Sequence, residues 1–433
     1  MVIDILILGF GKTGKSCLNY FNKHGKICKV FDTRCESEFS DTHLYKKNEI
    51  YFAELPKNIL ESINQVVISP GFDSGHEIIQ AIKDNNIEIV TDIDIFKSLY
   101  NHEIISITGT NGKTTVVSML EKVLNDAGKS AIACGNNGLP PLDLPHFDFD
   151  YVILELSSYQ LEYMKNFKTK IGVLLNISSD HLERHESISA YTKIKKSIFN
   201  NADIKIADYK LKDNFLDDEV SFFHFDAETM QSEIYDNVFD SVTIKSDHIV
   251  YDTLSLKYRG SHDLRNIFAV LSVANALQID IAVCIKALSN FIYPPHRIEL
   301  IKVSKNISWY NDSKSTNCDS TYWALKYLSQ NIILIMGGSK KIQDYSSLSN
   351  VIEDTVKLLI LVGNNAAEIK NQLKISTKIL EAENFREAVD IANNTAEDND
   401  SVILSPASPS FDRFNNYQQR GEAFKQAVID YAD

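Results

Sequence analysis

The chain has 433 residues, of which 44% are hydrophobic and 24% are charged, with a formal net charge of -14 and an isoelectric point near 5.3. This length favours two or three folded domains, and the composition is typical of globular proteins. The acidic surplus excludes a surface that captures nucleic acids nonspecifically, because such a surface needs excess cations to displace counterions.

The N-terminal residues 1–9 are apolar, but the run is short and Gly11, Lys12 and Gly14 follow at once. We expect neither a signal peptide nor a membrane span here, and hence a cytoplasmic protein without membrane insertion. The cysteines are scattered without CxxC pairs, which favours reduced thiols over disulfides or a zinc site. We expect no catalytic role for them.

Sets of apolar runs predict α/β domains in series. The first set comprises residues 3–8, 27–31, 66–68 and 87–90, with helices expected from about Gly14 and over 77–85. Continuous apolar runs are typical of strands buried on both faces of a parallel sheet. We therefore predict a Rossmann-like domain over residues 1–92.

Two further sets of runs follow. Residues 104–108, 151–155 and 171–177 predict a central P-loop ATPase-like domain over 93–294 with a mainly parallel sheet. Runs at 220–225 and 249–256 suggest an antiparallel appendage before a helix over 262–277. Residues 332–336, 358–362 and 402–404 predict a Rossmann-like C-terminal domain over 295–433. The predicted fold class is therefore α/β with three domains.

A glycine-rich turn joins the first strand to the first helix. Its glycines, Gly9, Gly11 and Gly14, have the spacing of the dinucleotide-binding fingerprint, and Asp32 lies at the end of the next strand. The physics requires only that a backbone turn and a helix N-terminus accept phosphate. The motif alone therefore leaves NAD, another nucleotide-linked ligand and a simple packing turn open.

A second glycine loop, residues 108–115, lies between a strand and an amphipathic helix and is typical of a phosphate-binding loop. Lys113 offers a charge for the β- and γ-phosphates of ATP, and the Thr114 hydroxyl can bind magnesium. The loop is a shortened variant, because Ile107 stands where the usual pattern has glycine, and a helix-capping turn is the alternative. The predicted ATP-binding residues of this loop are Gly109, Thr110, Asn111, Gly112, Lys113, Thr114 and Thr115.

Charged side chains follow the neighbouring strands. Glu155 ends one predicted strand and His181 follows the next, so both should reach the sheet edge where the phosphate loop emerges. A carboxylate there can bind a hard cation, although a solvated strand-end glutamate is the alternative. Lys195 lies on a basic helix face that on this pattern alone reads as exposed lysines.

Together these motifs resemble the Mur ligases of bacterial cell-wall synthesis along nearly the whole chain, whereas folylpolyglutamate synthetases share the ATP loop only. The residues that carry the resemblance are 9–14 with 32–34, 69–71, 311–317, 404–407, 410–412 and 419–421. The resemblance implies that the first domain binds the UDP part of a substrate rather than NAD. It assigns that contact to Lys12, Thr13, Gly14, Asp32, Thr33, Arg34, Ser69, Pro70 and Gly71, joined by Asn136 and His181.

For the central domain the resemblance implies two Mg²⁺ ions bound through Thr114, Glu155 and His181, with Lys195 as a carbamate. Lys195 matches the family's carbamylated lysine by its distance from Tyr191, whereas counting from His181 would suggest Lys196. Carbon dioxide would convert the cationic amine into an anion that can reach a magnesium ion. The implied catalytic group is Lys113, Glu155, His181 and Lys195.

For the last domain the resemblance implies that Arg297 and Asp312, with Asn266, approach the nucleotide. It assigns D-glutamate binding to Thr316, Lys341, Ser410 and Tyr417. The chain departs from the family pattern at Asp263, where asparagine is usual, at Pro409, and in the turn before Lys341, which lacks a glycine.

The reaction that the resemblance implies is an ATP-dependent amide ligation. The carboxylate of UDP-N-acetylmuramoyl-L-alanine would attack the γ-phosphate of ATP, and D-glutamate would displace phosphate from the acyl phosphate. We expect a monomer. The rival interpretations are a dehydrogenase that uses NAD, based on the first glycine turn, and a nonenzymatic ATPase switch that binds a partner.

Overall fold

The computed structural model describes residues 4–56, 58–100, 103–136, 138–145, 148–165, 167–215, 219–226, 231–235 and 261–431. The chain divides into two compact units. The first consists of Met1–Ile177, Arg184–Ile249 and Ile267–Ser289, and the second of Ser178–Glu183, Val250–Asn266 and Asn290–Asp433. No helix within the described part of the chain is long and apolar enough to span a membrane.

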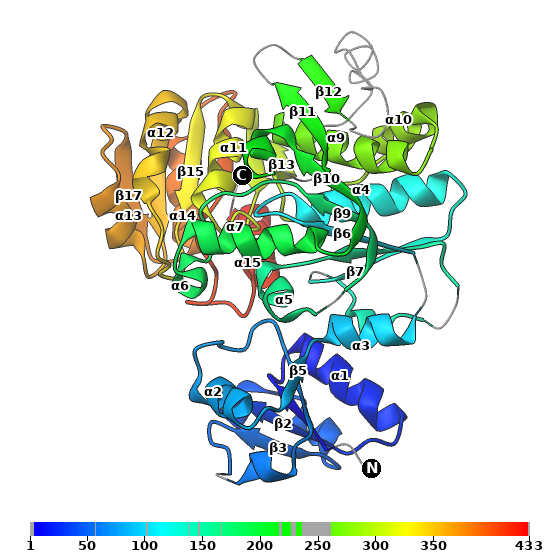
Figure 1. Cartoon of the computed structure of the whole chain (residues 1–433). Helices are drawn as coiled ribbons and strands as arrows, with labels where there is room; N and C mark the ends of the chain where they lie inside the picture. The colour runs from blue at the N-terminus through cyan, green and yellow to red at the C-terminus, as the bar shows by residue number, and fades with distance from the viewer. Residues whose placement is uncertain are drawn as a thin grey trace. The chain divides into compact units, whose positions relative to one another are not determined.

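The first unit begins with a parallel sheet in the order β3-β2-β1-β4-β5. Its strands are β1 (Ile5–Leu8), β2 (Cys28–Asp32), β3 (Glu49–Phe52), β4 (Gln65–Ile68) and β5 (Glu88–Val90), and its helices are α1 (Lys12–Lys23), α2 (Glu77–Asp84) and α3 (Asp92–Leu99). Ile5 and Ile7 pack with α1 and α3, while Leu6 and Leu8 pack with α2. The continuous apolar run is thus explained by helices on both faces of the sheet (Figure 1).

The second sheet of this unit has the order β12-β11-β10-β9-β6-β8-β7. Its strands are β6 (Glu103–Thr108), β7 (Ala131–Gly135), β8 (Tyr151–Glu155), β9 (Thr169–Leu174), β10 (Ala202–Asp208), β11 (Ser221–Asp226) and β12 (Gln231–Tyr235). Its helices are α4 (Lys113–Asp126), α5 (Ser158–Tyr163), α7 (Ile188–Lys196) and α10 (Ile281–Ser289). Two more helices, α6 (Leu182–His185) and α9 (Ser261–Ala276), have residues in both units. The α4 helix packs against β6, β7 and β8 and against α10, and α5 packs against α7.

The predicted antiparallel appendage is corrected in part. β10 pairs in parallel with both β9 and β11, so these strands extend the central sheet, and among its described strands only the β11–β12 pair is antiparallel. Buried Ile206 and Ala207 on β10 explain the difference, because a strand with apolar residues on both faces belongs inside a covered sheet. The predicted run at residues 249–256 lies outside the described residues.

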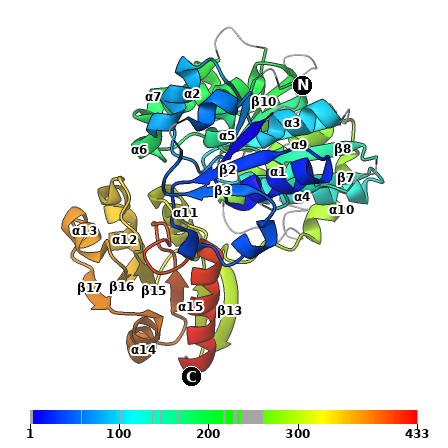
Figure 2. The ribbon, with the colours of Figure 1, turned by 90° about the horizontal axis from the view of Figure 1, so that it is seen from below.

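The second unit contains a sheet in the order β13-β14-β18-β15-β16-β17, which is parallel except for β13. Its strands are β13 (Glu299–Ser304), β14 (Ile307–Asn311), β15 (Ile332–Met336), β16 (Val356–Val362), β17 (Lys378–Ala382) and β18 (Ser401–Leu404). Figure 2 shows the helices on its two sides. One core lies beneath α11 (Cys318–Leu328), α12 (Ser349–Thr355) and α13 (Ala366–Gln372), and the other beneath α14 (Phe385–Thr395) and α15 (Tyr417–Tyr431).

Candidate active site

The phosphate loop follows β6 and ends at the first turn of α4. Gly112 precedes this helix in the left-handed conformation, with φ of 87°, which favours glycine. The Lys113 Nζ atom donates to the carbonyls of Gly109 and Thr110, at 2.8 and 2.9 Å. Thr114 and Thr115 follow Lys113 in the first turn of α4. The loop therefore presents a cation and a helix N-terminus together, as a phosphate site requires.

Asn176 fixes the loop from the neighbouring strand. Its side chain accepts from the backbone N–H of Asn111 at 2.9 Å and donates to the Asn111 carbonyl at 3.0 Å, and its own carbonyl accepts from the N–H of Thr110. The sequence reasoning did not select Asn176. Its position at the end of a predicted strand was the available signal, but its paired contacts depend on β9 lying next to β6.

Glu155 ends β8, next to β6 in the sheet, and its side chain is 2% exposed. One carboxylate oxygen, Oε1, accepts a hydrogen bond from Asn136 Nδ2 at 2.9 Å. The other, Oε2, is buried and has no hydrogen-bond partner among the described residues. A buried carboxylate oxygen without a donor is costly unless a cation or another ligand satisfies it.

The two candidate lysines on α7 point to different neighbours. Lys195 is 1% exposed, and its Nζ atom donates to Gly109 O at 2.9 Å and lies 3.2 Å from Thr108 Oγ1. Lys196 instead donates to the carbonyl of Asn214 and lies over the Phe215 ring. The structure thus brings Lys195, and not Lys196, beside the phosphate loop.

Close packing and hydrogen bonds within the chain hold the first glycine turn in place. Gly14 admits no side chain, because a Cβ atom there would lie 1.8 Å from the Gly9 carbonyl oxygen. Asp32 accepts from the Phe10 N–H at 2.6 Å and from the Arg34 guanidinium at 2.8 and 2.9 Å. Burial raises the pKa of Asp32, but the bonds from Arg34 and Phe10 outweigh it and hold the pKa below its usual value.

The remaining residues predicted to bind UDP lie around this turn. Ser69 follows β4, with its N–H bonded to Leu8 O and its hydroxyl 3.4 Å from Gly9 O. Lys12 donates to the carbonyl of Gly138. Arg184 Nη1 donates to Phe72 O at 2.9 Å, just beyond Pro70 and Gly71. Thr13 lies on the first turn of α1, and Thr33 follows β2.

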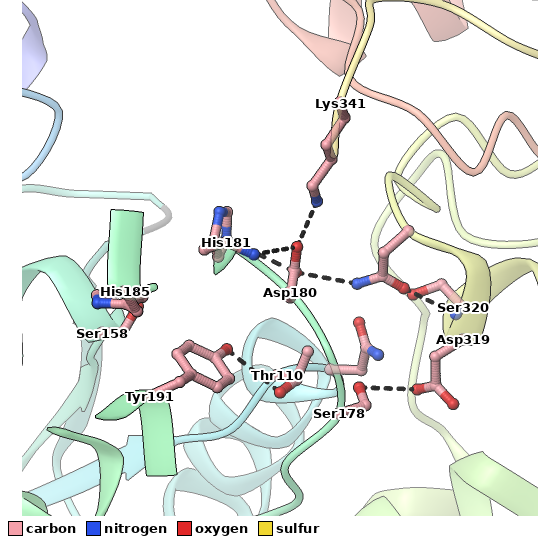
Figure 3. Close-up of polar contacts among 12 residues, drawn as sticks. Thr110, Ser158, Ser178, Asp180, His181, His185, Tyr191, Asp319, Ser320 and Lys341 are labelled. Atoms are coloured by element: carbon pink, nitrogen blue, oxygen red, sulfur yellow. Dashed lines mark hydrogen bonds and ion pairs between the residues drawn. The ribbon is translucent and has the colours of Figure 1, made fainter. Parts of the chain in front are cut away.

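In the second unit, Asp180 forms a buried polar cluster with Lys341 and Asn317 (Figure 3). Lys341 makes an ion pair with Asp180 Oδ1, and Asn317 Nδ2 donates to Oδ2 at 3.1 Å. Burial raises the pKa of Asp180, yet the charges of His181 and Lys341 outweigh it and hold the pKa low. The His181 ring is also 3.6 Å from Glu183, so its imidazole lies between two carboxylates.

Asp312 lies in the same unit at the end of β14. Its carboxylate accepts from Ser405 Oγ at 2.8 Å and from the Ile298 N–H at 3.2 Å. Burial raises the pKa of Asp312 to about 6. Arg297 precedes Ile298 directly, and Thr316 lies just beyond Asp312 in the loop that leads to α11. Asn266 and Asp263 are buried on α9.

Arg420 ties together the two loops that carry Thr316 and Ser410. Its guanidinium donates to Ser313 Oγ and O at 2.9 and 2.8 Å, and to the carbonyls of Ser408 and Pro409 at 2.8 and 3.0 Å. Burial lowers the pKa of Arg420 to about 10. Tyr417 lies one turn earlier on α15, with its ring 3.9 Å from Lys314 Nζ. The sequence analysis noted the motif of Arg420 but gave this residue no role.

Comparison with known proteins supplies the family. The UDP-N-acetylmuramoylalanine–D-glutamate ligase of Buchnera aphidicola subsp. Schizaphis graminum is 34% identical over 430 residues, covering 97% of this chain and 96% of that protein. The ligase of the same name from Caldicellulosiruptor saccharolyticus is 32% identical and covers 98% of each chain. The chain belongs to the Mur ligase family. Family profiles match in sequence order: a MurD-like N-terminal domain at residues 3–91, a Mur ligase middle domain at 107–274 and a Mur ligase glutamate ligase domain at 296–408.

Solved Mur ligases have the same fold. The UDP-N-acetylmuramate–alanine ligase MurC of Thermotoga maritima is 17% identical, covers 99% of each chain and superposes with a TM-score of 0.60. The MurF ligase of Thermotoga maritima, solved with ADP, is 15% identical, covers 93% of this chain and 95% of its own, and also has a TM-score of 0.60. The predicted α/β fold of three domains is confirmed, while the boundaries at residues 92 and 294 stay predictions.

Proposed function

We propose that this chain adds D-glutamate to UDP-N-acetylmuramoyl-L-alanine and converts ATP to ADP and phosphate in peptidoglycan precursor synthesis. The observation that carries this proposal is the 32–34% identity, over nearly the full length, to ligases that bear this name. The geometry of the first unit supports it, because a phosphate loop, an unsatisfied buried carboxylate and a buried lysine meet at the edge of one sheet.

The residues present fit magnesium. Glu155 Oε2 is a buried acceptor without a donor among the described residues, and oxygen is the ligand that Mg²⁺ prefers. No group of three or more His, Cys, Asp or Glu side chains suited to a metal occurs in the described ranges. We assign the ions to Glu155 and Thr114, with His181 and a Lys195 carbamate, and to ATP phosphate oxygens. Magnesium supplies neutralisation of the phosphate charge.

We propose Lys195 as the carbamylated residue. The neutral amine nitrogen would attack the carbon of CO₂, forming an N–C bond while one C=O electron pair moves to oxygen and a proton leaves the nitrogen. Two contacts support this choice over Lys196, namely the 2.9 Å bond to Gly109 O and the turn of Lys196 toward Asn214. The change from cation to anion would occur beside the phosphate loop.

The first unit would also bind the UDP part of the substrate. Because Asp32 is paired with Arg34 and Phe10, its carboxylate is already engaged within the chain. A dinucleotide site uses this acidic position for the ribose hydroxyls, but UDP carries a ribose as well, so the choice of UDP over NAD rests on the resemblance to the family and not on this pairing. The contacts are assigned to Lys12, Thr13, Gly14, Asp32, Thr33, Arg34, Ser69, Pro70, Gly71 and Asn136 in this unit, and to His181, which belongs to the second unit.

The second unit would bind D-glutamate through Thr316, Lys341, Ser410 and Tyr417, and approach the nucleotide through Asn266, Arg297 and Asp312. Arg420 supports this assignment, since it holds Ser313 and Ser408 in fixed positions near Thr316 and Ser410. Lys341 is already paired with Asp180, so a glutamate carboxylate would share or replace that partner.

The chain's own residues would orient the reactants and stabilise charge. Lys113 draws the γ-phosphate into line for attack by the substrate carboxylate, which gives an acyl phosphate. The amine of D-glutamate then attacks the acyl carbon, and phosphate leaves from the tetrahedral intermediate. No protein nucleophile is needed, because the substrate carboxylate and the amine of D-glutamate are the attacking groups. The phosphate loop would stabilise the developing negative charge.

Phosphate release from ATP tests this proposal directly. The purified chain is supplied with UDP-N-acetylmuramoyl-L-alanine, with and without D-glutamate, and with L-glutamate and other amino acids in parallel. Release that requires both substrates and accepts D-glutamate alone is the expected result. Release with another acceptor would keep the ligase chemistry and overturn the specificity, whereas no release with any acceptor would revive the ATPase switch. Tight nicotinamide binding would revive the dehydrogenase.

A further inference from the structure

His185 is a buried histidine for which the proposed reaction has no direct use. Its Nε2 atom lies 2.9 Å from the hydroxyl of Ser158, and both side chains are buried. Its ring packs between Tyr159 and Tyr191, with centroid distances of 5.6 and 5.3 Å. Hydrogen bonds between buried groups resist displacement, because breaking them leaves polar atoms without water.

Tyr191 extends this contact to the phosphate loop. Its hydroxyl lies 3.2 Å from Thr110 Oγ1, and Lys195 Nζ lies 4.8 Å from the centre of its ring. Tyr191 and Lys195 are one turn apart on α7 and therefore share one face of the helix. The contacts form a series from Ser158 through His185 and Tyr191 to Thr110, and Figure 3 shows His185 and Ser158 on one side of Tyr191 and Thr110 on the other.

The opposite end of the series reaches the strand that carries Glu155. Glu155 is the last residue of β8, and Ser158 begins α5 after Leu156 and Ser157. His185 ends α6, and the next residue, Glu186, turns the chain with φ of 63° before α7 begins. The bond between Ser158 and His185 thus joins the segment after Glu155 to the start of the helix that carries Lys195.

We propose that His185 and Ser158 are positioning residues for the Lys195 carbamate. Their hydrogen bond holds the Tyr191 ring, and this ring sets the rotation of α7 so that the Lys195 amine stays beside Gly109. This inference rests on the proposed function, because it presumes that Lys195 is carbamylated. A histidine with a merely structural role would stabilise the fold without changing the affinity of Lys195 for carbon dioxide.

Three variants separate the hydrogen bond from the ring contact. His185→Phe keeps a ring against Tyr191 but cannot bond to Ser158, and Ser158→Ala removes the bond from the other side. His185→Gln places an amide near the position of Nε2 and can restore the bond. Ser187→Ala is the matched control, because Ser187 caps α7 through the Ala190 N–H and its loss weakens the helix without removing the His185 contacts.

The carbamate is measured by ¹³C NMR of the full chain equilibrated with ¹³C-bicarbonate, beside ligase activity at each bicarbonate concentration and thermal melting. His185→Phe and Ser158→Ala should each raise the bicarbonate concentration for half-maximal carbamate and activity by about 3- to 10-fold. The double variant should add nothing further. His185→Gln should stay near the parent, and so should Ser187→Ala. If His185→Phe does not fold, Ser158→Ala and His185→Gln carry the same test.

The outcomes distinguish this inference from the proposed function. Unchanged bicarbonate dependence in His185→Phe and Ser158→Ala, with an active carbamylated parent, would overturn the positioning role alone. An equal shift in Ser187→Ala would also overturn it, by assigning the effect to general loosening of α7. An active parent without a carbamate signal would remove both the carbamate and this inference. A parent without ligase activity would overturn the proposed function itself.

Discussion

The two glycine loops of the first unit share the order strand, turn and helix, yet the side chains around them differ. At the first loop, Gly14 packs against Gly9 O, and the nearby acid, Asp32, is already paired with Arg34. At the second, the amines of Lys113 and Lys195 both bond to Gly109 O, and Glu155 keeps one unpaired oxygen among the described residues. The glycine spacing identifies two anion-binding turns but does not identify their ligands.

We infer that the charged residues near each turn, and not the turn itself, determine which ligand is bound. A turn supplies backbone N–H groups that suit any phosphate. In the proposed function, the charges that distinguish a bound UDP group from a reacting ATP come from residues at the end of β2 in one case and from β8 and α7 in the other. Variants that remove one of these charges at a time test this difference between the two loops.

The largest effect is expected from Lys113→Met. Without this ammonium group the γ-phosphate would lose a cation that the loop supplies, and kcat/KM for ATP should fall by about 10³-fold. Lys122→Met is the matched control, since Lys122 lies on the same helix and pairs with Asp126 on the surface. Phosphate release measures both. A loss below tenfold for Lys113→Met would show that the second loop does not act on the reacting phosphate.

Glu155→Gln should have the second largest effect. The substitution keeps an oxygen for Asn136 but removes the negative charge from the buried site, so turnover should fall on the order of 10²-fold and more magnesium should be needed. Titration of activity with magnesium measures this shift. Glu103→Gln, at the opposite end of β6, should behave as the parent. If the magnesium requirement of Glu155→Gln is unchanged, the unpaired oxygen of Glu155 does not bind magnesium.

Asp32→Asn tests the first loop by itself. Losing the charged bonds to Arg34 should release its guanidinium and raise KM for the UDP-linked substrate by about tenfold, while KM for ATP stays the same. Asp41→Asn is the control, because it breaks an ion pair with Lys15 in which the carboxylate is more exposed than that of Asp32. A rise in KM for ATP instead would mean that the two loops do not serve separate ligands.

Much of the fold follows from local pattern. The continuous apolar run at residues 332–336 predicts β15 with the bounds observed, and the glycine loop at 108–115 predicts the turn before α4. The apolar pattern did not predict β7, because Ala131–Gly135 is short and contains small residues. The place of β10 inside the parallel sheet also escapes it, since strand order depends on long-range packing.

The candidate site is less predictable than the fold. A basic helix face predicts exposed lysines, yet Lys195 is buried because α7 packs beside the phosphate loop. Asn176 and His185 likewise gain their contacts from segments distant in sequence. From the sequence, such residues could be identified only through the family resemblance. The roles assigned to the site residues stay predictions.

The smallest effect concerns a second buried aspartate of the first unit, Asp92, which unlike Asp32 has a carboxylate oxygen without a hydrogen-bond partner among the described residues. Burial raises the pKa of Asp92 to about 7, above the ordinary value of 3.8. The protonated form therefore contributes stability that is complete below pH 3.8 and is lost as the pH rises through about 7.

Asp92→Asn should remove this dependence, because an amide stays neutral at every pH in the range. Its gain in unfolding free energy over the parent should be about 2 kcal/mol larger at pH 8 than at pH 5. Urea unfolding at both pH values measures the gain, with Asp84→Asn on the exposed face of α2 as the control. Asp32→Asn should change stability in the opposite direction, since the low folded pKa of Asp32 means that its ionised form stabilises the fold. If the unfolding free energies of Asp92→Asn and the parent change with pH in the same way, burial does not raise the pKa of Asp92. The contrast with Asp32 would then be lost.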